Sequence, residues 1–222
     1  MGDRILKALA IIATLAGVAS AGPAGRVAGK VTLTDADGKP ATAVVIVYVV
    51  GFPEPGTGKR AADIVQKDRK FVPDLVAITV GESVSFPNGD QFLHNVFSQS
   101  PPRPFDLGSF KHDQRKDKDF PTPGVVDVYC NIHPEMAATI LVLPNKRHTQ
   151  AAPDGSYAID GVPPGTWTVF AYSRRAAKPA SARVTVTAGA DTTANLALLR
   201  GAEREHLNKY GEKYHEPTTT YR

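Results

Sequence analysis

Short apolar runs rich in β-branched residues, bounded by glycine and proline, recur along almost the whole chain. The 222 residues include 19 glycines and 18 prolines, and these two residue types favour turns and interrupt helices. The runs between them have the length of ordinary strands, about five to eight residues. This pattern predicts an all-β fold of the sandwich type. Only residues 203–214, in a polar C-terminal tail, have a pattern that a short helix would fit.

The predicted strands fall into three blocks. The run 44–50 is continuously apolar, which is typical of a strand buried on both faces. A Pro- and charge-rich segment, 98–122, is expected to be a loop. Within it, basic and acidic residues alternate over 111–119, which indicates a solvated loop or, alternatively, a docking surface for a redox partner. The expected strands are 27–33 and 44–50; then 75–79, 83–86, 92–97, 125–130 and 138–143; then a pair within 153–172, followed by 183–187 and 192–199.

Strand alternation predicts where the side chains of the middle block point. Cys130 shares a face with Val128, and His94 shares a face with Phe92 and Val96. Both faces are apolar and should line the core. A cysteine and a histidine that point inward at one end of a sandwich can hold a common metal ion.

The strongest functional signal surrounds the only cysteine of the chain, Cys130. His133 and Met136 follow it at intervals of three residues, and His94 lies upstream. Two imidazoles, a thiolate and a weak thioether form the ligand set of a blue-copper electron-transfer site. Pro134 biases His133 away from the helical conformation and stiffens the loop. We therefore expect one type 1 copper ion per chain, with Met136 as its weak axial ligand.

Other interpretations of these residues stay open. Zinc also accepts cysteine and histidine, and Glu135 could replace Met136 as an oxygen ligand. Taken alone, a buried cysteine is more often a small hydrophobe than a ligand. Asn95 is a candidate for a hydrogen bond that ties the strand of His94 to the ligand loop. The remaining histidines have no partners at metal-ligand spacing and are expected at the surface: His112, His148, His206 and His215.

The N-terminus has the pattern of an export signal. Two basic residues precede an apolar run at 8–18, and small residues at 19–21 fit a cleavage site. The run is too short to span a bilayer, so we expect a cleaved signal at 1–21, no stable membrane insertion afterwards, and a periplasmic or secreted protein; an uncleaved anchor is the alternative. The formal charge of +4 is too small to indicate binding to nucleic acid.

At the ligand residues the chain resembles a cupredoxin. The loop from Cys130 to Met136 is similar to the short ligand loop of amicyanins, including the proline after the histidine, and the stretch Phe-Pro-Asn-Gly-Asp before His94 also fits the family. The run 90–136 is similar to methylamine-utilisation-like cupredoxins. The resemblance covers about 71–143 and implies a Greek-key β-sandwich. It also implies that the edge of His133 is the exit for electrons.

Residues 26–50 and 154–199 resemble a carboxypeptidase regulatory-like, or transthyretin-like, β-sandwich. The resemblance lies in Asp-Gly-x-Pro near 37–40 and in Asp-Gly-x-Tyr with Val-Pro-Pro-Gly-Thr near 154–166. It implies that a cupredoxin domain interrupts a second, smaller sandwich. The expected boundaries are 24–50 and 146–200 for the two parts of this sandwich, 59–145 for the cupredoxin domain, and 201–222 for the tail. Alternatively, 26–50 is an N-terminal strand pair of the cupredoxin.

These observations predict an exported protein that is not an enzyme and that carries single electrons between periplasmic partners. A redox partner protein is expected to dock near His133. No second metal cluster and no catalytic triad or paired-carboxylate pattern is evident in the sequence. Two alternatives use the same residues differently. The protein could carry or buffer copper without fast redox cycling, or it could be an interaction module or scaffold.

Overall fold

The computed structural model describes residues 22–202 and 205–214, so the expected signal at 1–21 lies outside the described residues. Every regular element in the described ranges is a β-strand. The predicted all-β fold is confirmed. No helix in the described part of the chain is long and apolar enough to cross a membrane.

The first and last parts of the chain form one β-sandwich, which we call the terminal sandwich. Its strands are β1 (Gly25–Thr34), β2 (Ile46–Val50), β13 (His148–Gln150), β14 (Ser156–Val162), β15 (Gly165–Tyr172), β16 (Ala180–Val186), β17 (Asp191–Thr193) and β18 (Leu196–Leu199). One sheet has the order β14-β1-β17, with β18 also paired to β1, and the other has the order β13-β2-β15-β16. Val27, Val47 and Val169 are fully buried in the core between them.

The pairing of β1 and β2 bears on the alternative placement of residues 26–50. β1 pairs with β14, β17 and β18, and β2 pairs with β13 and β15. In the described residues these two strands therefore lie in sheets with the C-terminal strands, and they do not form an extra pair of the middle sandwich. The expected domain boundaries and the family resemblance of this sandwich stay predictions.

The middle of the chain forms the central sandwich. Its strands are β3 (Arg60–Asp63), β4 (Val65–Lys67), β5 (Lys70–Val72), β6 (Leu75–Thr79), β7 (Ser83–Pro87), β8 (His94–Ser98), β9 (Phe105–Phe110), β10 (Arg115–Asp119), β11 (Gly124–Tyr129) and β12 (Ala137–Leu143). The larger sheet has the order β6-β12-β11-β8-β9, the smaller one β10-β7-β3, and β4 pairs with β5. The core between the sheets includes Phe86, Val96 and Ile140, which are fully buried.

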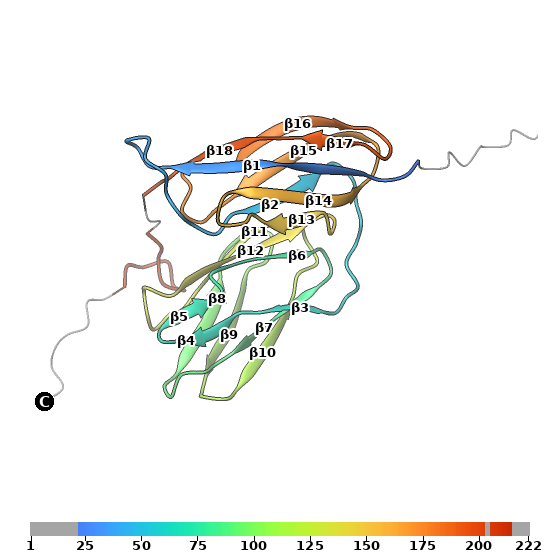
Figure 1. The fold of residues 1–222 in the computed structure, drawn as a ribbon. Coiled ribbons are helices and arrows are strands. Elements are labelled where there is room, and N and C mark those ends of the chain that lie inside the picture. The colour runs from blue at the N-terminus through green and yellow to red at the C-terminus, as the bar shows by residue number, and fades with distance from the viewer. Residues whose placement is uncertain (1–21, 203–204, 215–222) are drawn as a thin grey trace, which may run out of the picture.

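The two sandwiches meet along a small apolar cluster, which we call the joint. It consists of Ile46, Leu75, Leu141, Leu143 and Tyr172. Figure 1 shows the terminal sandwich above the central one, with β12 and β6 facing β13 and β2. Strands β2 and β12 are apolar on both faces because one face lines a sandwich core and the other lines the joint. This confirms the expected buried strand for residues 46–50, whereas Val44 precedes the strand and is exposed.

The prediction of a loop over 98–122 is wrong, because the segment contains β9 and β10. In β10, alternate residues are exposed, and the charged side chains between them cover apolar surface. The Nζ atoms of Lys116 and Lys118 lie 5.2 and 5.7 Å from the ring centroids of Phe110 and Phe105. Lysine stems can pack on aromatic rings while the ammonium stays in water. The segment with alternating charges therefore contains an edge strand, β10.

Three smaller expectations also need correction. Strand β8 begins at His94, so Phe92 lies outside the strand and is exposed. The run 192–199 is two strands, because the Asn195 side chain accepts a hydrogen bond from the Lys30 amide and interrupts the ladder with β1. The described tail residues 205–214 form turns rather than a helix. There the Asn208 side chain accepts hydrogen bonds from the amides of Tyr210 and Glu212. These bonds compete with helical backbone hydrogen bonds and favour turns.

Candidate metal centre

Two neighbouring strands of the central sandwich bring His94 and Cys130 together. His94 is the first residue of β8, and Cys130 directly follows β11. These strands are adjacent, with Tyr129 opposite Phe97. Both His94 and Cys130 are fully buried, so the expected inward direction of their side chains is present.

Three of the four expected ligand residues present their donor atoms to one point. The Cys130 Sγ lies 3.9 Å from the His94 Nδ1 and 3.8 Å from the His133 Nδ1, and the two Nδ1 atoms are 3.1 Å apart. In the described residues this is the one group of three or more His, Cys, Asp or Glu side chains with metal-binding geometry. A thiolate with two imidazoles fits copper or zinc, so the residues present fit the expected metal.

The loop from Cys130 to Met136 is closed by its own hydrogen bonds. The Cys130 amide donates to the Met136 carbonyl (3.2 Å), and the Met136 amide donates to the His133 carbonyl (3.1 Å). The Ile132 amide lies 3.4 Å from the Cys130 Sγ and donates to it. Met136 is fully buried in the same core as Cys130. The side chains of Cys130 and Met136 thus lie on the apolar side of a short, internally bonded loop.

The Asp90 carboxylate holds the far side of the His94 ring. Its Oδ2 accepts a hydrogen bond from the His94 Nε2 at 2.8 Å, and its two oxygens also accept the amides of Asp68 and Arg69 at 2.7 and 3.0 Å. Burial acts to raise the pKa of Asp90, but these hydrogen bonds outweigh it and lower the pKa. The carboxylate accepts, so the Nε2 carries the hydrogen and the Nδ1 lone pair faces Cys130.

His133 is the one member of the cluster that reaches the surface. Its pKa is lowered, first by burial and then by the neighbouring His94, so the neutral ring is favoured. Phe92 packs against both imidazoles, with ring centroids 5.1 Å from His94 and 5.5 Å from His133. A neutral imidazole has the lone pair that a metal requires.

Asn95 makes the hydrogen bond expected of it. Its Oδ1 accepts the Asn131 amide of the ligand loop at 3.3 Å, and its Nδ2 donates to the Asp106 carboxylate at 2.7 Å. Strands β8 and β9 and the ligand loop are thereby linked. The bond fixes the distance between the backbone that carries His94 and the backbone that carries Cys130.

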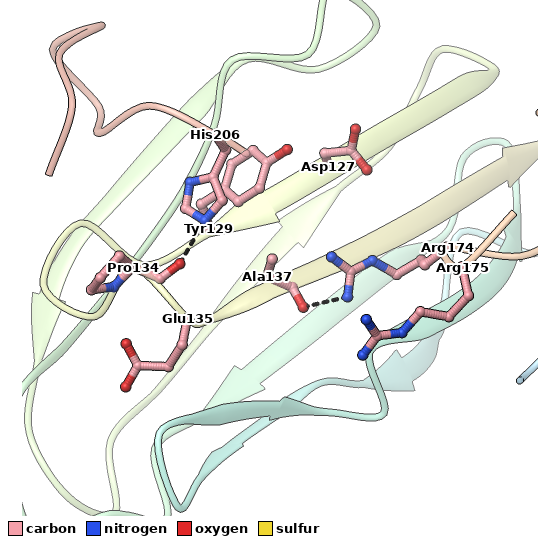
Figure 2. A pocket seen from close by; sticks show the side chains of 8 residues that line it. All are labelled: Asp127, Tyr129, Pro134, Glu135, Ala137, Arg174, Arg175 and His206. Carbon is pink, nitrogen blue, oxygen red and sulfur yellow. Dashed lines mark hydrogen bonds between the residues drawn. The ribbon is translucent and has the colours of Figure 1, made fainter. Parts of the chain in front are cut away.

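Glu135, the alternative oxygen ligand, is not part of the cluster. Its side chain is exposed and lines a cavity of about 220 Å³ beside the loop, with Arg174 and Arg175 on the opposite wall (Figure 2). The Arg174 guanidinium donates to the Ala137 carbonyl at 2.7 Å. The Glu135 carboxylate is thus not among the donor atoms that lie within 4.8 Å of one another at His94, Cys130 and His133.

Three of the histidines expected at the surface, His112, His148 and His206, are partly buried. His206 is partly buried, and its ring stacks on Tyr129 at a centroid distance of 4.0 Å. His148 is partly buried, and burial lowers its pKa. His112 lies on the rim, 3.2 Å from the Asp90 carbonyl, and His215 lies outside the described residues. The sequence interpretation missed Asp90, whose one signal is its place in the turn before His94.

Neither a scan of the sequence against family models nor a search of curated proteins finds a match. A search of solved structures does find similar chains. A purple cupredoxin from Nitrosopumilus maritimus is 23% identical over 37% of this chain and 99% of its own, with a TM-score of 0.34. A reduced mutant of amicyanin is 20% identical over 43% of this chain and 97% of its own, with a TM-score of 0.35.

A copper-containing nitrite reductase (NirK) from Thermus scotoductus SA-01 is also similar. It is 27% identical over 41% of this chain, with a TM-score of 0.35, and the chain spans 23% of its length. These matches are cupredoxins or a copper enzyme, and each is similar to less than half of this chain.

Proposed function

We propose that this chain is a type 1 copper protein that carries single electrons and catalyses no reaction of its own. His94, Cys130 and His133 would hold the metal, with Met136 as a weak axial ligand. The observation that carries the proposal is the convergence of one thiol sulfur and two imidazole nitrogens within 4.8 Å. When bound, copper supplies one-electron chemistry, because thiolate and thioether favour Cu(I) while imidazole accepts Cu(II).

The hydrogen bonds around these side chains favour a role in fast electron exchange over a role in copper storage or transport. Asp90 holds the His94 ring, Asn95 holds the loop, and the loop closes on itself through Cys130 and Met136. Ligands that are already oriented need little movement between two oxidation states. A carrier that only stores copper has no need for such restraint.

The surface around His133 supports docking of a redox partner. Three apolar side chains there are 42, 47 and 45% exposed: Phe92, Leu93 and Ile132. Exposed apolar side chains grouped around one polar group are typical of transient interaction sites. We propose that the partner covers this group, so that His133 lies between the metal and the partner's own redox centre. We further propose a periplasmic or secreted location, on the signal-like N-terminus.

The first test is visible absorption after Cu(II) is added to the purified protein, with Cys130→Ser as the variant and His148→Gln as the matched histidine control. We expect an intense thiolate-to-copper charge-transfer band in the wild type and in His148→Gln, and its loss in Cys130→Ser. A weak band, or a band that survives in Cys130→Ser, would overturn the proposal.

A second measurement separates electron transfer from copper carriage. The electron self-exchange rate and the rate of copper release to a chelator are measured on the same loaded protein. Fast exchange with slow release is the expected result. Slow exchange with fast release would identify a copper carrier, and a purified chain that refuses copper would identify a scaffold. Competition between Cu(II) and Zn(II) for the site tests the choice of metal.

A further inference from the structure

The described tail residues 205–214 lie against the ligand loop, far from the strand that precedes them in sequence. Strand β18 belongs to the terminal sandwich, whereas the tail runs down to the side of the central sandwich near β8 (Figure 1). It contacts residues that precede it by more than 70 positions, because Tyr214 bonds to Cys130 and His206 bonds to Pro134. We call residues 205–214 the strap.

The strap binds two backbone carbonyls of the ligand loop. The Tyr214 hydroxyl donates to the Cys130 carbonyl at 2.7 Å, and the His206 Nε2 donates to the Pro134 carbonyl at 2.8 Å. Figure 2 shows the His206 ring against the Tyr129 ring, with a ring nitrogen of His206 directed at the Pro134 carbonyl. The amide of Cys130 is already bonded within the loop. With the bond from Tyr214, the N–H and the C=O of Cys130 are both hydrogen-bonded.

Aromatic packing reinforces these bonds. The ring of His206 is stacked on Tyr129, with ring planes 21° apart, and meets the Tyr214 ring edge-on at 5.2 Å. Tyr129 directly precedes Cys130, so this stack covers the start of the loop.

The strap is itself anchored to the ligand loop and to β9. The Lys209 amide donates to the Asn131 Oδ1 at 2.9 Å, and the Lys209 ammonium pairs with Asp106 at 2.9 Å. Asp106 also accepts from Asn95, which accepts the amide of Asn131. One polar network therefore joins the strap, β8, β9 and the loop.

We propose that the strap positions the metal-binding loop, with Tyr214 and His206 acting through the Cys130 and Pro134 carbonyls. It restrains the loop on the Tyr129 side and leaves the Phe92 side of His133 open to a partner. The strap touches none of the three donor atoms in the described contacts, so its residues are positioning residues. Its effect on metal retention rests on the proposed function, but its effect on loop mobility does not.

The test is amide hydrogen exchange of the full, metal-free chain, followed by mass spectrometry of the peptide that covers residues 129–136. Tyr214→Phe removes one hydroxyl, and His206→Ala removes the stack and the second bond. Tyr210→Phe is the matched control, since Tyr210 lies in the same strap and is 71% exposed. Loss of one hydrogen bond should speed exchange of this peptide by about threefold to tenfold, and the double variant should exceed either single one.

Exchange in Tyr214→Phe and His206→Ala at the wild-type rate would overturn the proposal. Equal acceleration in peptides of the terminal sandwich would do so as well, because it would indicate general destabilisation. If the variants release copper to a chelator several-fold faster, while Tyr210→Phe does not, the strap also controls metal retention. If the wild-type protein with Cu(II) shows no charge-transfer band, the proposed function is wrong. The hydrogen-exchange result for the strap is unaffected by that outcome.

Discussion

At the scale of single residues, the Asp90 carboxylate connects a turn to His94, one of the proposed metal ligands. The turn between β4 and β5 has two consecutive residues with positive φ, Asp68 at 53° and Arg69 at 54°. This conformation is uncommon outside glycine, and here it directs both amides at Asp90. Asp90 in turn accepts from His94. The hairpin of β4 and β5 thus restrains the His94 imidazole indirectly, through Asp90.

Replacing Asp90 with asparagine keeps the size of the side chain and removes its charge. We expect Asp90→Asn to weaken copper binding by about 10-fold to 100-fold, the usual effect of losing a partner of a metal-bound histidine. The reduction potential should rise, because a nearby negative charge favours Cu(II) over Cu(I). Competition titration against a chelator measures the affinity, and voltammetry measures the potential.

Asp113→Asn is the matched control, because Asp113 is an exposed aspartate on the rim of the same sandwich. It should leave both quantities unchanged. Unaltered affinity and potential in Asp90→Asn would show that the carboxylate only supports the turn. A thermal unfolding curve of each variant separates this case from misfolding.

At the scale of elements, β12 contributes side chains to two apolar interiors, the core of the central sandwich and the joint. Ala138, Ile140 and Val142 belong to the core of the central sandwich, while Leu141 and Leu143 belong to the joint. The alternation follows from the strand period of two. The strand also directly follows the loop from Cys130 to Met136, so the position of the proposed metal ligands depends on both interiors.

Truncating Leu141, which is 1% exposed, should leave a cavity in the joint. We expect Leu141→Ala to lower the free energy of unfolding by about 2–5 kcal/mol. Guanidinium unfolding, followed by fluorescence of the single tryptophan, Trp167, measures this change. Val125→Ala removes a more exposed side chain from β11 and should cost less than about 1 kcal/mol. Equal effects of the two substitutions would mean that the joint adds little stability.

At the scale of the whole molecule, the two sandwiches are held by polar contacts as well as by the joint. Arg174 of the terminal sandwich pairs with Asp74 of the central one at 3.2 Å. Arg147 pairs at 2.9 Å with Glu54, in the segment between β2 and β3. His148 belongs to this region, since Glu82 of the central sandwich acts on its pKa. Burial nevertheless lowers the pKa of His148 below 6.5.

The lowered pKa of His148 makes stability depend on pH. Below about pH 6.5 the unfolded chain binds a proton that folded His148 does not, so the free energy of unfolding falls as the pH decreases towards the folded pKa. His148→Gln should flatten this part of the curve. Urea unfolding at a series of pH values from 7.5 to about 5 measures the slope. A slope unaffected by His148→Gln would contradict the prediction.

The sequence by itself determined the all-β fold and the identity of the clustered donor residues. The reason is local, because Cys130, His133 and Met136 lie in one seven-residue loop, where chain geometry alone keeps them close. The inward direction of His94 followed from strand alternation. Most strand positions were predicted for the same reason, since Gly and Pro turns and apolar periodicity are properties of neighbouring residues.

Only the tertiary structure decided the features that depend on distant partners. β10 is a strand because its lysine side chains pack on Phe105 and Phe110. The pattern of residues 111–119 alone does not show that these aromatic rings lie beside it. The polar tail has no apolar face to reveal where it docks, yet Tyr214 reaches the Cys130 carbonyl from 84 residues away. Contacts of this separation depend on the sheet order of both sandwiches, which neighbouring residues do not encode.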